Sequence, residues 1–500
     1  MNKPIRTISI FCLVLFGALL VNATYLQYYA AGRYNDDARN RRVVDAEFSR
    51  ERGAILVGRD PVAESVPSED RFDFQRVYPK PFMYAGLTGY FGYGGAVTGL
   101  ERSQNDVLSG DDSRLFVNRL IDMLGNEGPK GGDVELTVNA AAQQAAWDAV
   151  NALPGDNVQA SVVALEPSTG KILAMVTTPT FDPGTLANHD FAANQRAYER
   201  LADDPAQPLL NRAVQTTLPP GSTFKIVTAA AALESGKYDA GSMVPGGSSY
   251  QLPQTSGDSG LIDNEGRACG SSQSGVRFTQ AMENSCNTTF AQLAVEVGAD
   301  AMLEQAEKFG FNSTWFDELQ STNGRSLLAE STFPADMNPP QTGQSGIGQF
   351  EVRSTPLQMA MVAAGIANNG VVMKPYLVDE VQSADSDVVA TTEPEQLSTA
   401  VSPQTASELT KLLVATVNDG TASAAAITGI QVAGKTGTAQ SGHDDVPPYA
   451  WFTSFAPAEN ARVAVAVMIQ NADIPRDDIA GGKWGGPIAK KVMEAVLKSD

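Results

Sequence analysis

The chain has 500 residues, of which 43% are hydrophobic and 19% are charged, and its formal net charge is −21. This hydrophobic content predicts a folded protein rather than a disordered one, and the length allows two or more domains. So negative a charge repels nucleic acid and argues against a nucleic-acid partner. The two histidines, His189 and His443, are too few for a metal centre and do not suggest a serine–histidine–aspartate triad.

The first element is an apolar run at residues 7–29, which is long enough to cross a membrane as a helix. A cleaved signal peptide is the alternative. No Ala-x-Ala cleavage site follows the run, so we expect an uncleaved anchor behind a short cytoplasmic tail, residues 1–6. The positive-inside rule does not favour export of the rest, because Arg33, Arg39, Arg41 and Arg42 follow the span. Long domains translocate largely regardless of such charges, and we place residues 30–500 outside.

Residues 30–155 differ in composition from the rest of the chain. Glycine clusters between Gly86 and Gly99 indicate tight turns in an irregular α+β module. At its end, residues 132–138 read as a strand and residues 140–152 as a helix. This module therefore leads from the apolar helix to the rest of the chain.

Two strand-like runs come next, at residues 161–166 and 172–176. The turn between them contains Ser168 and Lys171, which are spaced like a catalytic Ser-x-x-Lys but fit a hairpin turn. We expect this hairpin to open an antiparallel sheet. The decoy shows that a lone Ser-x-x-Lys is most often structural.

A second Ser-x-x-Lys, formed by Ser222 and Lys225, precedes an apolar, Ala-rich run that reads as a buried helix. Prolines and a glycine stop this helix on its N-terminal side, so Ser222 lies at the helix start. Residues three apart share a helix face, and the amine of Lys225 can therefore reach the hydroxyl of Ser222. A hydroxyl beside an amine is a nucleophile beside a candidate base, and the helix N-terminus suits a developing oxyanion.

Two further motifs occur later in the chain. Ser285-Cys286-Asn287 comes after an amphipathic run at residues 278–283, and it is not specific alone because Ser103-Gln104-Asn105 repeats its pattern. Lys435-Thr436-Gly437-Thr438 continues an alternating, strand-like run, and this Lys-Thr-Gly occurs once in the chain. We expect Gly434 and Gly437 to leave the strand edge bare for a substrate backbone.

Ser-x-x-Lys, Ser-x-Asn and Lys-Thr-Gly in this order resemble the signature of penicillin-binding proteins and class A β-lactamases. Gly346-Ile347-Gly348-Gln349, with the segments around residues 355–360 and 366–370, resembles the penicillin-binding proteins in particular. The module at residues 30–155 resembles the non-catalytic pedestal of class B members and is too short for a glycosyltransferase domain. The whole resembles the actinobacterial penicillin-binding protein A branch of that class.

The resemblance implies an α+β fold with a membrane helix, a pedestal and a penicillin-binding domain. The central antiparallel sheet of that domain would include the Lys435 strand and residues 451–456 and 463–470, with helices flanking it and a closing helix at 487–498. The polar stretch 383–399 is expected to be a solvated excursion. The predicted divisions are 1–6 (cytoplasmic tail), 7–29 (transmembrane helix), 30–155 (pedestal) and 156–500 (transpeptidase domain).

The resemblance also implies the chemistry. Ser222 attacks the penultimate D-alanine of a peptidoglycan stem peptide, Lys225 accepts the proton, and Ser285 relays it. Lys435 and burial would lower the pKa of Lys225 as this requires. Asn287 would bind the substrate backbone, and backbone N–H groups of Ser222 and Thr438 would form the oxyanion hole. Thr436, Gly437 and Thr438 belong to the substrate-binding strand, where the two threonine hydroxyls would hold the substrate carboxylate. No cofactor or metal is expected.

The three cysteines predict one disulfide. Cys12 lies in the apolar run, whereas Cys269 and Cys286 lie in the expected catalytic domain, in a compartment that we take to be oxidising. We predict that Cys269 and Cys286 are bonded, which would brace the second motif. Two separate buried thiols are the alternative.

Three functions remain open on the sequence. The first is a class B D,D-transpeptidase of the cell wall, which β-lactams inhibit covalently. The second is a serine hydrolase with the same motifs, a D,D-carboxypeptidase or a β-lactamase. The third is a non-catalytic β-lactam-binding scaffold or sensor. The expected partners are stem peptides, β-lactams, the membrane through one N-terminal helix, and a glycosyltransferase of the RodA and FtsW kind, but no nucleic acid.

Overall fold

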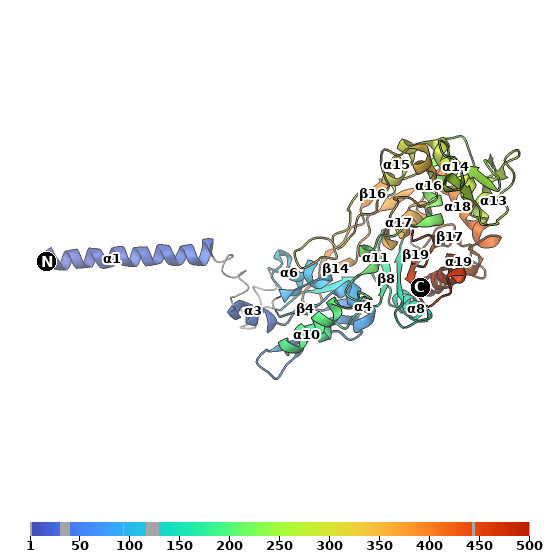
Figure 1. Cartoon of the computed structure of the whole chain (residues 1–500). Helices are drawn as coiled ribbons and strands as arrows, with labels where there is room; N and C mark the ends of the chain where they lie inside the picture. Colours follow the sequence, from blue (N-terminus) through green and yellow to red (C-terminus); the bar gives the residue numbers. More distant parts are fainter. Residues whose placement is uncertain (1–2, 31–40, 94, 117–129, 443–445, 500) are drawn as a thin grey trace.

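The fold comes from a computed structural model that describes residues 3–30, 41–93, 95–116, 130–442 and 446–499. A long helix, α1, stands apart from the body, and the elements after it lead into a larger C-terminal region (Figure 1). The predicted α+β architecture, with an apolar N-terminal helix and a central antiparallel sheet, is confirmed. His443, which the sequence placed close after the third motif, lies outside the described residues.

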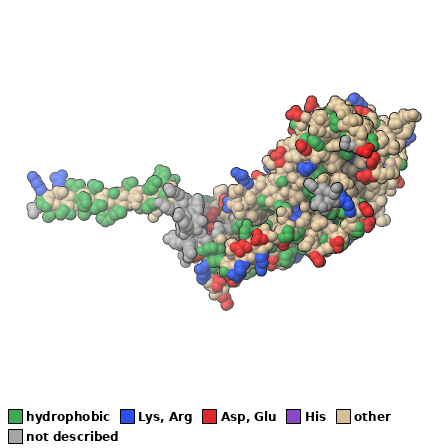
Figure 2. Space-filling view, viewed as in Figure 1, with side chains coloured by type: hydrophobic (Ala, Val, Ile, Leu, Met, Phe, Trp, Pro, Cys, Tyr) green, Lys and Arg blue, Asp and Glu red, His purple; other side chains and the backbone are tan. Residues whose placement is uncertain are grey.

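The N-terminal helix is apolar along most of its length. α1 (Lys3–Thr24) continues into a π-helical turn, Tyr25–Tyr29, and none of its most apolar part is buried against the described chain. Apart from basic residues near its start, the visible face of this rod is hydrophobic (Figure 2). A helix of this length and composition suits a membrane better than water. It begins at Lys3, a few residues before the predicted span.

A six-stranded sheet forms the core of the region next to α1. Its order is β15-β14-β6-β1-β2-β3, in which β1 and β6 run parallel and the other neighbours antiparallel. These strands are β1 (Ile55–Val57), β2 (Asp60–Pro67), β3 (Phe74–Val77), β6 (Asp133–Leu136), β14 (Val378–Gln382) and β15 (Val388–Thr391). Two of the six strands therefore come from far later in the sequence.

Residues 384–399 are exposed or half-buried, as expected of a solvated excursion, but they also form two strands that the sequence did not predict. β15 adds to the edge of the six-stranded sheet, and β16 (Gln396–Thr399) pairs with β13 (Val371–Met373). The ends of both later strands are exposed and the middle residues are only half-buried. Such strands need no regular apolar alternation, so a polar sequence can still form them.

Short elements complete the pedestal around this sheet. They are α3 (Arg41–Phe48), α4 (Pro81–Thr88), β4 (Phe91–Gly92), β5 (Gly95–Ala96), α5 (Gly99–Ser103), α6 (Asn105–Leu108), a 3-10 turn (Ser113–Leu115), α9 (Gly184–Ala187) and α10 (Phe191–Ala202). At their centre, the fully buried Glu101 carboxylate forms ion pairs with Arg52 at 2.9 Å and Arg76 at 2.6 Å. Burial opposes ionisation of Glu101, but the charges of Arg76 and Arg52 outweigh it and lower its pKa.

The C-terminal region is built on a five-stranded antiparallel sheet of order β17-β18-β19-β7-β8. Its strands are β7 (Gln159–Leu165), β8 (Ile172–Thr178), β17 (Ala433–Ala439), β18 (Tyr449–Ala456) and β19 (Val463–Asn471). α8 (Ala140–Asn151) and α19 (Gly481–Lys498) pack together on one face, and α17 (Pro356–Ala367) covers the other. β17, the strand with the third motif, lies at the edge of this sheet.

Beyond the α17 face lies a mainly helical part. Its helices are α11 (Arg212–Gln215), α12 (Lys225–Glu234), α13 (Phe278–Glu283), α14 (Asn287–Val297), α15 (Ala299–Lys308), α16 (Pro339–Ser345) and α18 (Pro403–Asn418). Two small antiparallel pairs of strands belong to the same part, β9 (Met243–Val244) with β12 (Val276–Arg277), and β10 (Ser249–Gln251) with β11 (Leu261–Asp263). 3-10 turns cover Gly221–Phe224, Asp258–Gly260, Ser423–Ala425 and Arg476–Asp478. The edge of β17 faces this helical part, and the candidate site lies between them.

Candidate active site

Ser222 lies in the 3-10 turn that immediately precedes α12. The backbone of Gly221 has φ +53°, and a Cβ there would lie 2.9 Å from the carbonyl oxygen of Thr438. A side chain at this position would therefore collide with β17. The absence of a side chain at Gly221 therefore lets the turn pack closely against β17. Ser222 is partly exposed and lines a pocket.

Lys225 is the first residue of α12 and is fully buried. Its amine donates hydrogen bonds to the backbone oxygen of Ser285 at 2.7 Å, to the Ser285 hydroxyl at 3.2 Å and to Oδ1 of Asn287 at 2.7 Å. The expected contact with Ser222 is not among its hydrogen bonds to the described residues. Burial lowers the pKa of Lys225 well below its usual value, and repulsion from Lys435 adds to the effect.

Lys435 reaches the same hydroxyl from β17. Its buried amine donates hydrogen bonds to the Ser285 hydroxyl at 2.8 Å and to the backbone oxygen of Thr436 at 2.9 Å. Burial also lowers the pKa of Lys435, with a further contribution from Arg267. The structure thus brings the second and third motifs together with Lys225 at one point, the hydroxyl of Ser285.

Ser285 has an unusual backbone. It occupies the short connection between α13 and α14 with φ +52°, a left-handed conformation that serine rarely adopts. The adjacent Cys286 is bonded to Cys269, and the amine of Lys225 holds the Ser285 carbonyl. These constraints keep the serine hydroxyl between the two lysines despite the cost of the conformation.

A pocket of about 350 Å³ lies over this cluster. The described residues that line it are Ser222, Ile262, Glu265, Arg267, Ser285, Asn287, Gln344, Ile347, Gln349, Phe350, Thr436, Thr438 and Gln440. Five of the ten predicted site residues line this pocket: Ser222, Ser285, Asn287, Thr436 and Thr438. Lys225 lies directly beneath it and is hydrogen-bonded to Ser285. Lys435 joins them from the strand floor.

The glycines of β17 allow close packing around the site. A Cβ at Gly437 would lie 2.9 Å from the carbonyl oxygen of Pro220 and 3.0 Å from the Cβ of Trp451. At Gly434 a Cβ would meet Phe452, Ser454 and Val417 at 3.3 Å. The two glycines therefore make room for the protein's own packing, and Gly437 makes room for the Ser222 turn in particular.

The segment around Gly346 holds the turn from the other side. The amide of Gly221 donates a hydrogen bond to the carbonyl of Gly348 at 3.0 Å, and Thr228 of α12 donates one to the carbonyl of Gly346 at 2.7 Å. A Cβ at Gly348 would lie 2.2 Å from the Gly221 carbonyl oxygen. The stretch that distinguished the sequence from the lactamases therefore supports the turn that carries Ser222.

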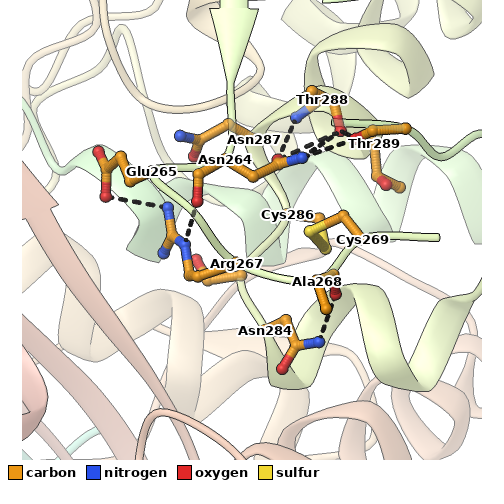
Figure 3. The surroundings of a disulfide bond; sticks show 12 residues. Asn264, Glu265, Arg267, Ala268, Cys269, Asn284, Cys286, Asn287, Thr288 and Thr289 are labelled. Atoms are coloured by element: carbon orange, nitrogen blue, oxygen red, sulfur yellow. Dashed lines mark hydrogen bonds and ion pairs between the residues drawn. A yellow bond between two sulfur atoms is a disulfide. The ribbon is translucent and has the colours of Figure 1, made fainter. Parts of the chain in front are cut away.

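Sequence reasoning did not single out Glu265 and Arg267, which also line the pocket. Both precede Cys269 in a loop that the disulfide fastens beside the second motif (Figure 3). The available sequence signal was that both residues come shortly before Cys269, which was predicted to be bonded to Cys286 of the second motif. His189 lies elsewhere, paired with Asp70 and packed on Phe72 in the pedestal.

Chemically, the site combines a partly exposed alcohol, two amines with lowered pKa values and a hydroxyl hydrogen-bonded to both. An amine that loses its proton easily can act as a general base for the alcohol. The shared hydroxyl offers a path for that proton towards a leaving group. This combination suits acyl transfer through a covalent serine intermediate.

Comparisons with known proteins agree with this chemistry. Residues 160–494 match the penicillin binding protein transpeptidase domain, and residues 52–134 match the penicillin binding protein A dimerisation domain. The peptidoglycan D,D-transpeptidase PbpA of Mycolicibacterium smegmatis is 43% identical over 501 residues, covering 100% of this chain and 99% of the relative. The PbpA of Mycobacterium tuberculosis H37Rv is 41% identical over 502 residues and covers 100% of both chains.

Solved structures give the same result. The ceftriaxone acyl-enzyme complex of penicillin-binding protein A from M. tuberculosis superposes with a TM-score of 0.85 at 41% identity, covering 91% of this chain and 100% of that one. The penicillin G acyl-enzyme complex of the same protein gives a TM-score of 0.82 at 42% identity and covers 90% of this chain and 100% of that one.

Proposed function

Because the chain belongs to the penicillin-binding protein transpeptidase family, it is a serine D,D-transpeptidase of peptidoglycan synthesis, and we propose that Ser222 is the residue acylated by stem peptides and by β-lactams. One observation carries the assignment. The hydroxyl of Ser285 accepts hydrogen bonds from both Lys225 and Lys435 in the wall of a pocket that Ser222 also lines.

In the first step, the hydroxyl oxygen of Ser222 attacks the carbonyl of the penultimate D-alanine, and Lys225 accepts the hydroxyl proton. The oxyanion that forms lies against the backbone N–H groups of Ser222 and Thr438. The tetrahedral intermediate then expels the last D-alanine, whose nitrogen receives the proton from Lys225 through Ser285. The short path from Lys225 to Ser285 to Lys435 supports this relay.

In the second step, an amine from a neighbouring stem peptide attacks the acyl-enzyme carbonyl. The amine loses a proton to Lys225, the new amide forms, and the bond to Ser222 breaks with return of a proton to its oxygen. Water in place of the amine would give the carboxypeptidase or lactamase outcome. Measuring cross-linked dimers against hydrolysed peptide separates these reactions.

Substrate positioning falls to β17 and Asn287. β17 is an edge strand, so an extended peptide can add to its free side by backbone hydrogen bonds. Thr438 is exposed and Thr436 lines the same pocket, which supports them as the proposed ligands of the C-terminal carboxylate. Asn287, whose Oδ1 accepts from Lys225, presents its side chain to the same pocket and binds the substrate amide.

The Ser222 assignment is tested by labelling. Ser222→Ala should abolish covalent labelling by a fluorescent penicillin, because the variant lacks the oxygen that forms the ester. Mass spectrometry of the wild-type adduct should find the added mass on the peptide that contains residue 222. Ser168→Ala, in the hairpin turn, is the matched control and should label normally. Labelling that persists in Ser222→Ala, or an adduct on another peptide, contradicts the assignment.

The apolar N-terminal helix makes this a membrane-anchored protein, and we propose a single span with residues 1–6 inside and residues 30–500 outside. The substrate lies outside the membrane, which supports this orientation. We retain 30–155 as the pedestal and 156–500 as the transpeptidase domain. β14 and β15 of the later part join the pedestal sheet, and α9 and α10 pack around it. A transpeptidase makes no glycan, so a RodA- or FtsW-type glycosyltransferase is the proposed partner, reached through α1 and the pedestal.

A further inference from the structure

The loop at residues 263–269, here called the strap, is fastened beside the second motif at both ends. At one end, Cys269 is bonded to Cys286. At the other, Asn264 Nδ2 donates to the Thr288 hydroxyl at 3.0 Å, and the Thr288 amide donates to Asn264 Oδ1 at 3.0 Å. Figure 3 shows these bonds together with the disulfide. The strap is thus attached to the start of α14.

Two further side chains of the second motif region hold the strap. Asn287 Nδ2 donates to the carbonyl of Asp263 at 2.9 Å. Asn284 Nδ2 donates to the carbonyl of Ala268 at 2.6 Å (Figure 3). Because Asn287 also accepts from Lys225, the strap is joined to the catalytic cluster by a single side chain. A loop held at this many points presents its own side chains in fixed positions.

The strap presents Arg267 to the pocket. Arg267 Nε donates to the carbonyl of Asn264 at 2.8 Å, and its Nη2 pairs with Glu265 at 3.1 Å. The Arg267 side chain remains 28% exposed, and its Nη1 makes no hydrogen bond to the described residues. One end of the guanidinium is therefore oriented by the strap while the other keeps donors available to a ligand.

Arg267 is the one positively charged side chain among the described residues that line this pocket. Lys225 and Lys435 lie beneath it with lowered pKa values, partly because of the Arg267 charge itself. Among the described lining residues, Arg267 and Glu265 are the charged ones, and Glu265 is 66% exposed to solvent, which screens its charge. The fork geometry of the Arg267 guanidinium matches a carboxylate.

We propose that Arg267 is a specificity-determining residue that binds a carboxylate of the donor stem peptide other than its C-terminal one. The proposal rests on the assignment of Ser222 as the acylated residue. Thr436 and Thr438 approach the pocket from β17, whereas Arg267 comes from the strap beside α14. If Thr436 and Thr438 of β17 bind the C-terminal carboxylate of a donor peptide, Arg267 therefore contacts a different part of that peptide.

The test compares two synthetic donor peptides that end in the same D-alanyl-D-alanine. One carries a free side-chain carboxylate on the preceding residue, and in the other that carboxylate is an amide. D-alanine release is measured with the full-length protein in detergent and without an acceptor. Wild type should acylate with the free carboxylate about tenfold faster in kcat/KM, the size expected for one charged hydrogen-bonded contact.

Arg267→Gln should reduce the ratio of the two rates to about one. Arg267→Lys should restore part of it, because the charge returns without the fork. Glu265→Gln should increase the ratio, because it removes the competing carboxylate. Any effect of Arg267 on the pKa of Lys225 acts on both peptides and cancels in the ratio. Arg277→Gln, an exposed arginine on β12 outside the pocket lining, is the matched control and should leave the ratio unchanged.

The proposal is overturned if wild type does not distinguish the peptides, or if Arg267→Gln slows both equally, as a purely structural loop residue would. It is also overturned if a preference emerges only for a carboxylate on an added acceptor. In each of these cases a penicillin adduct on Ser222 in wild type keeps the proposed function intact. Absence of that adduct would refute the function itself, whatever the peptide ratio.

Discussion

Lys225 and Lys435 share one hydrogen-bond acceptor, and this arrangement explains how two basic side chains can lie buried side by side. The Ser285 hydroxyl has two lone pairs and one proton, so it accepts from both amines at 3.2 and 2.8 Å. Two buried ammonium groups would repel each other strongly. Burial, and for Lys225 also the charge of Lys435, lowers the pKa values of both lysines, which favours a neutral amine that can act as a base.

The pH dependence of acylation should report this base. Burial, followed by the charge of Lys435, lowers the pKa of Lys225, which loses its proton as pH rises through that lowered value. The rate of labelling by a fluorescent penicillin should therefore rise with pH along an acid limb and then level off. Lys435→Met removes the repulsion, which raises the pKa of Lys225 and moves the limb to higher pH by about one unit. An unmoved limb, or one at lower pH, would contradict this coupling.

Sequence spacing selected the proposed site residues but did not predict their contacts. Ser222 and Lys225 are three apart and were expected to touch directly, yet the Lys225 amine bonds to Ser285 and Asn287. The 3-10 turn places Ser222 outside α12, so helical spacing did not apply to the pair. Arg267 escaped notice because a single arginine in a loop has no periodicity, and only the path of the chain to Cys269 brings it to the pocket.

At the scale of elements, the pedestal depends on a buried charge cluster. Glu101 Oε1 and Oε2 pair with Arg76 and Arg52, and all three side chains are at most 1% exposed. Glu101→Ala would leave two buried guanidinium groups without their anion. We expect it to lower the free energy of unfolding by about 3–5 kcal/mol.

Chemical denaturation of the detergent-solubilised chain measures this loss. Glu304→Ala is the control, because the Glu304–Lys308 pair is exposed and its removal should leave stability nearly unchanged. Equal effects of the two substitutions would show that burial does not set the contribution of the Glu101 cluster.

Helices and strands with regular apolar patterns were predicted well. The run at 278–283 forms α13, and the strands predicted at 161–166 and 172–176 differ from β7 and β8 by two residues or fewer at each end. α19 was predicted from Pro487 but begins at Gly481. A Cβ at Gly485 would lie 2.7 Å from the Cβ of Phe452, so glycines of poor helix propensity allow this end to pack closely on β18.

At the scale of the whole molecule, the orientation across the membrane can be tested with single cysteines. In a Cys12→Ser background, Cys269 and Cys286 are bonded and do not react. Lys491→Cys, on the exposed side of α19, should react with a membrane-impermeant maleimide in intact cells. Lys3→Cys, at the start of α1, should react only after permeabilisation. The opposite pattern would reverse the proposed topology.

The joining of distant segments could not be predicted from the sequence. Composition separated residues 30–155 from the rest, but the pedestal sheet also contains β14 and β15. Val381 pairs with Val134 and Gln382 with Asp133, contacts between residues far apart in the chain. Pairing of this kind depends on the three-dimensional path, and local patterns do not encode it.

The β14–β15 pair has a practical consequence for anyone dividing this protein into fragments. The chain leaves the transpeptidase domain after α17, completes the pedestal sheet and returns to form α18. Expression of residues 156–500 alone would release β14 from β6, exposing a hydrogen-bonding edge that invites self-association. A soluble, monomeric catalytic fragment must therefore either retain the pedestal or replace the β14–β15 excursion with a short linker.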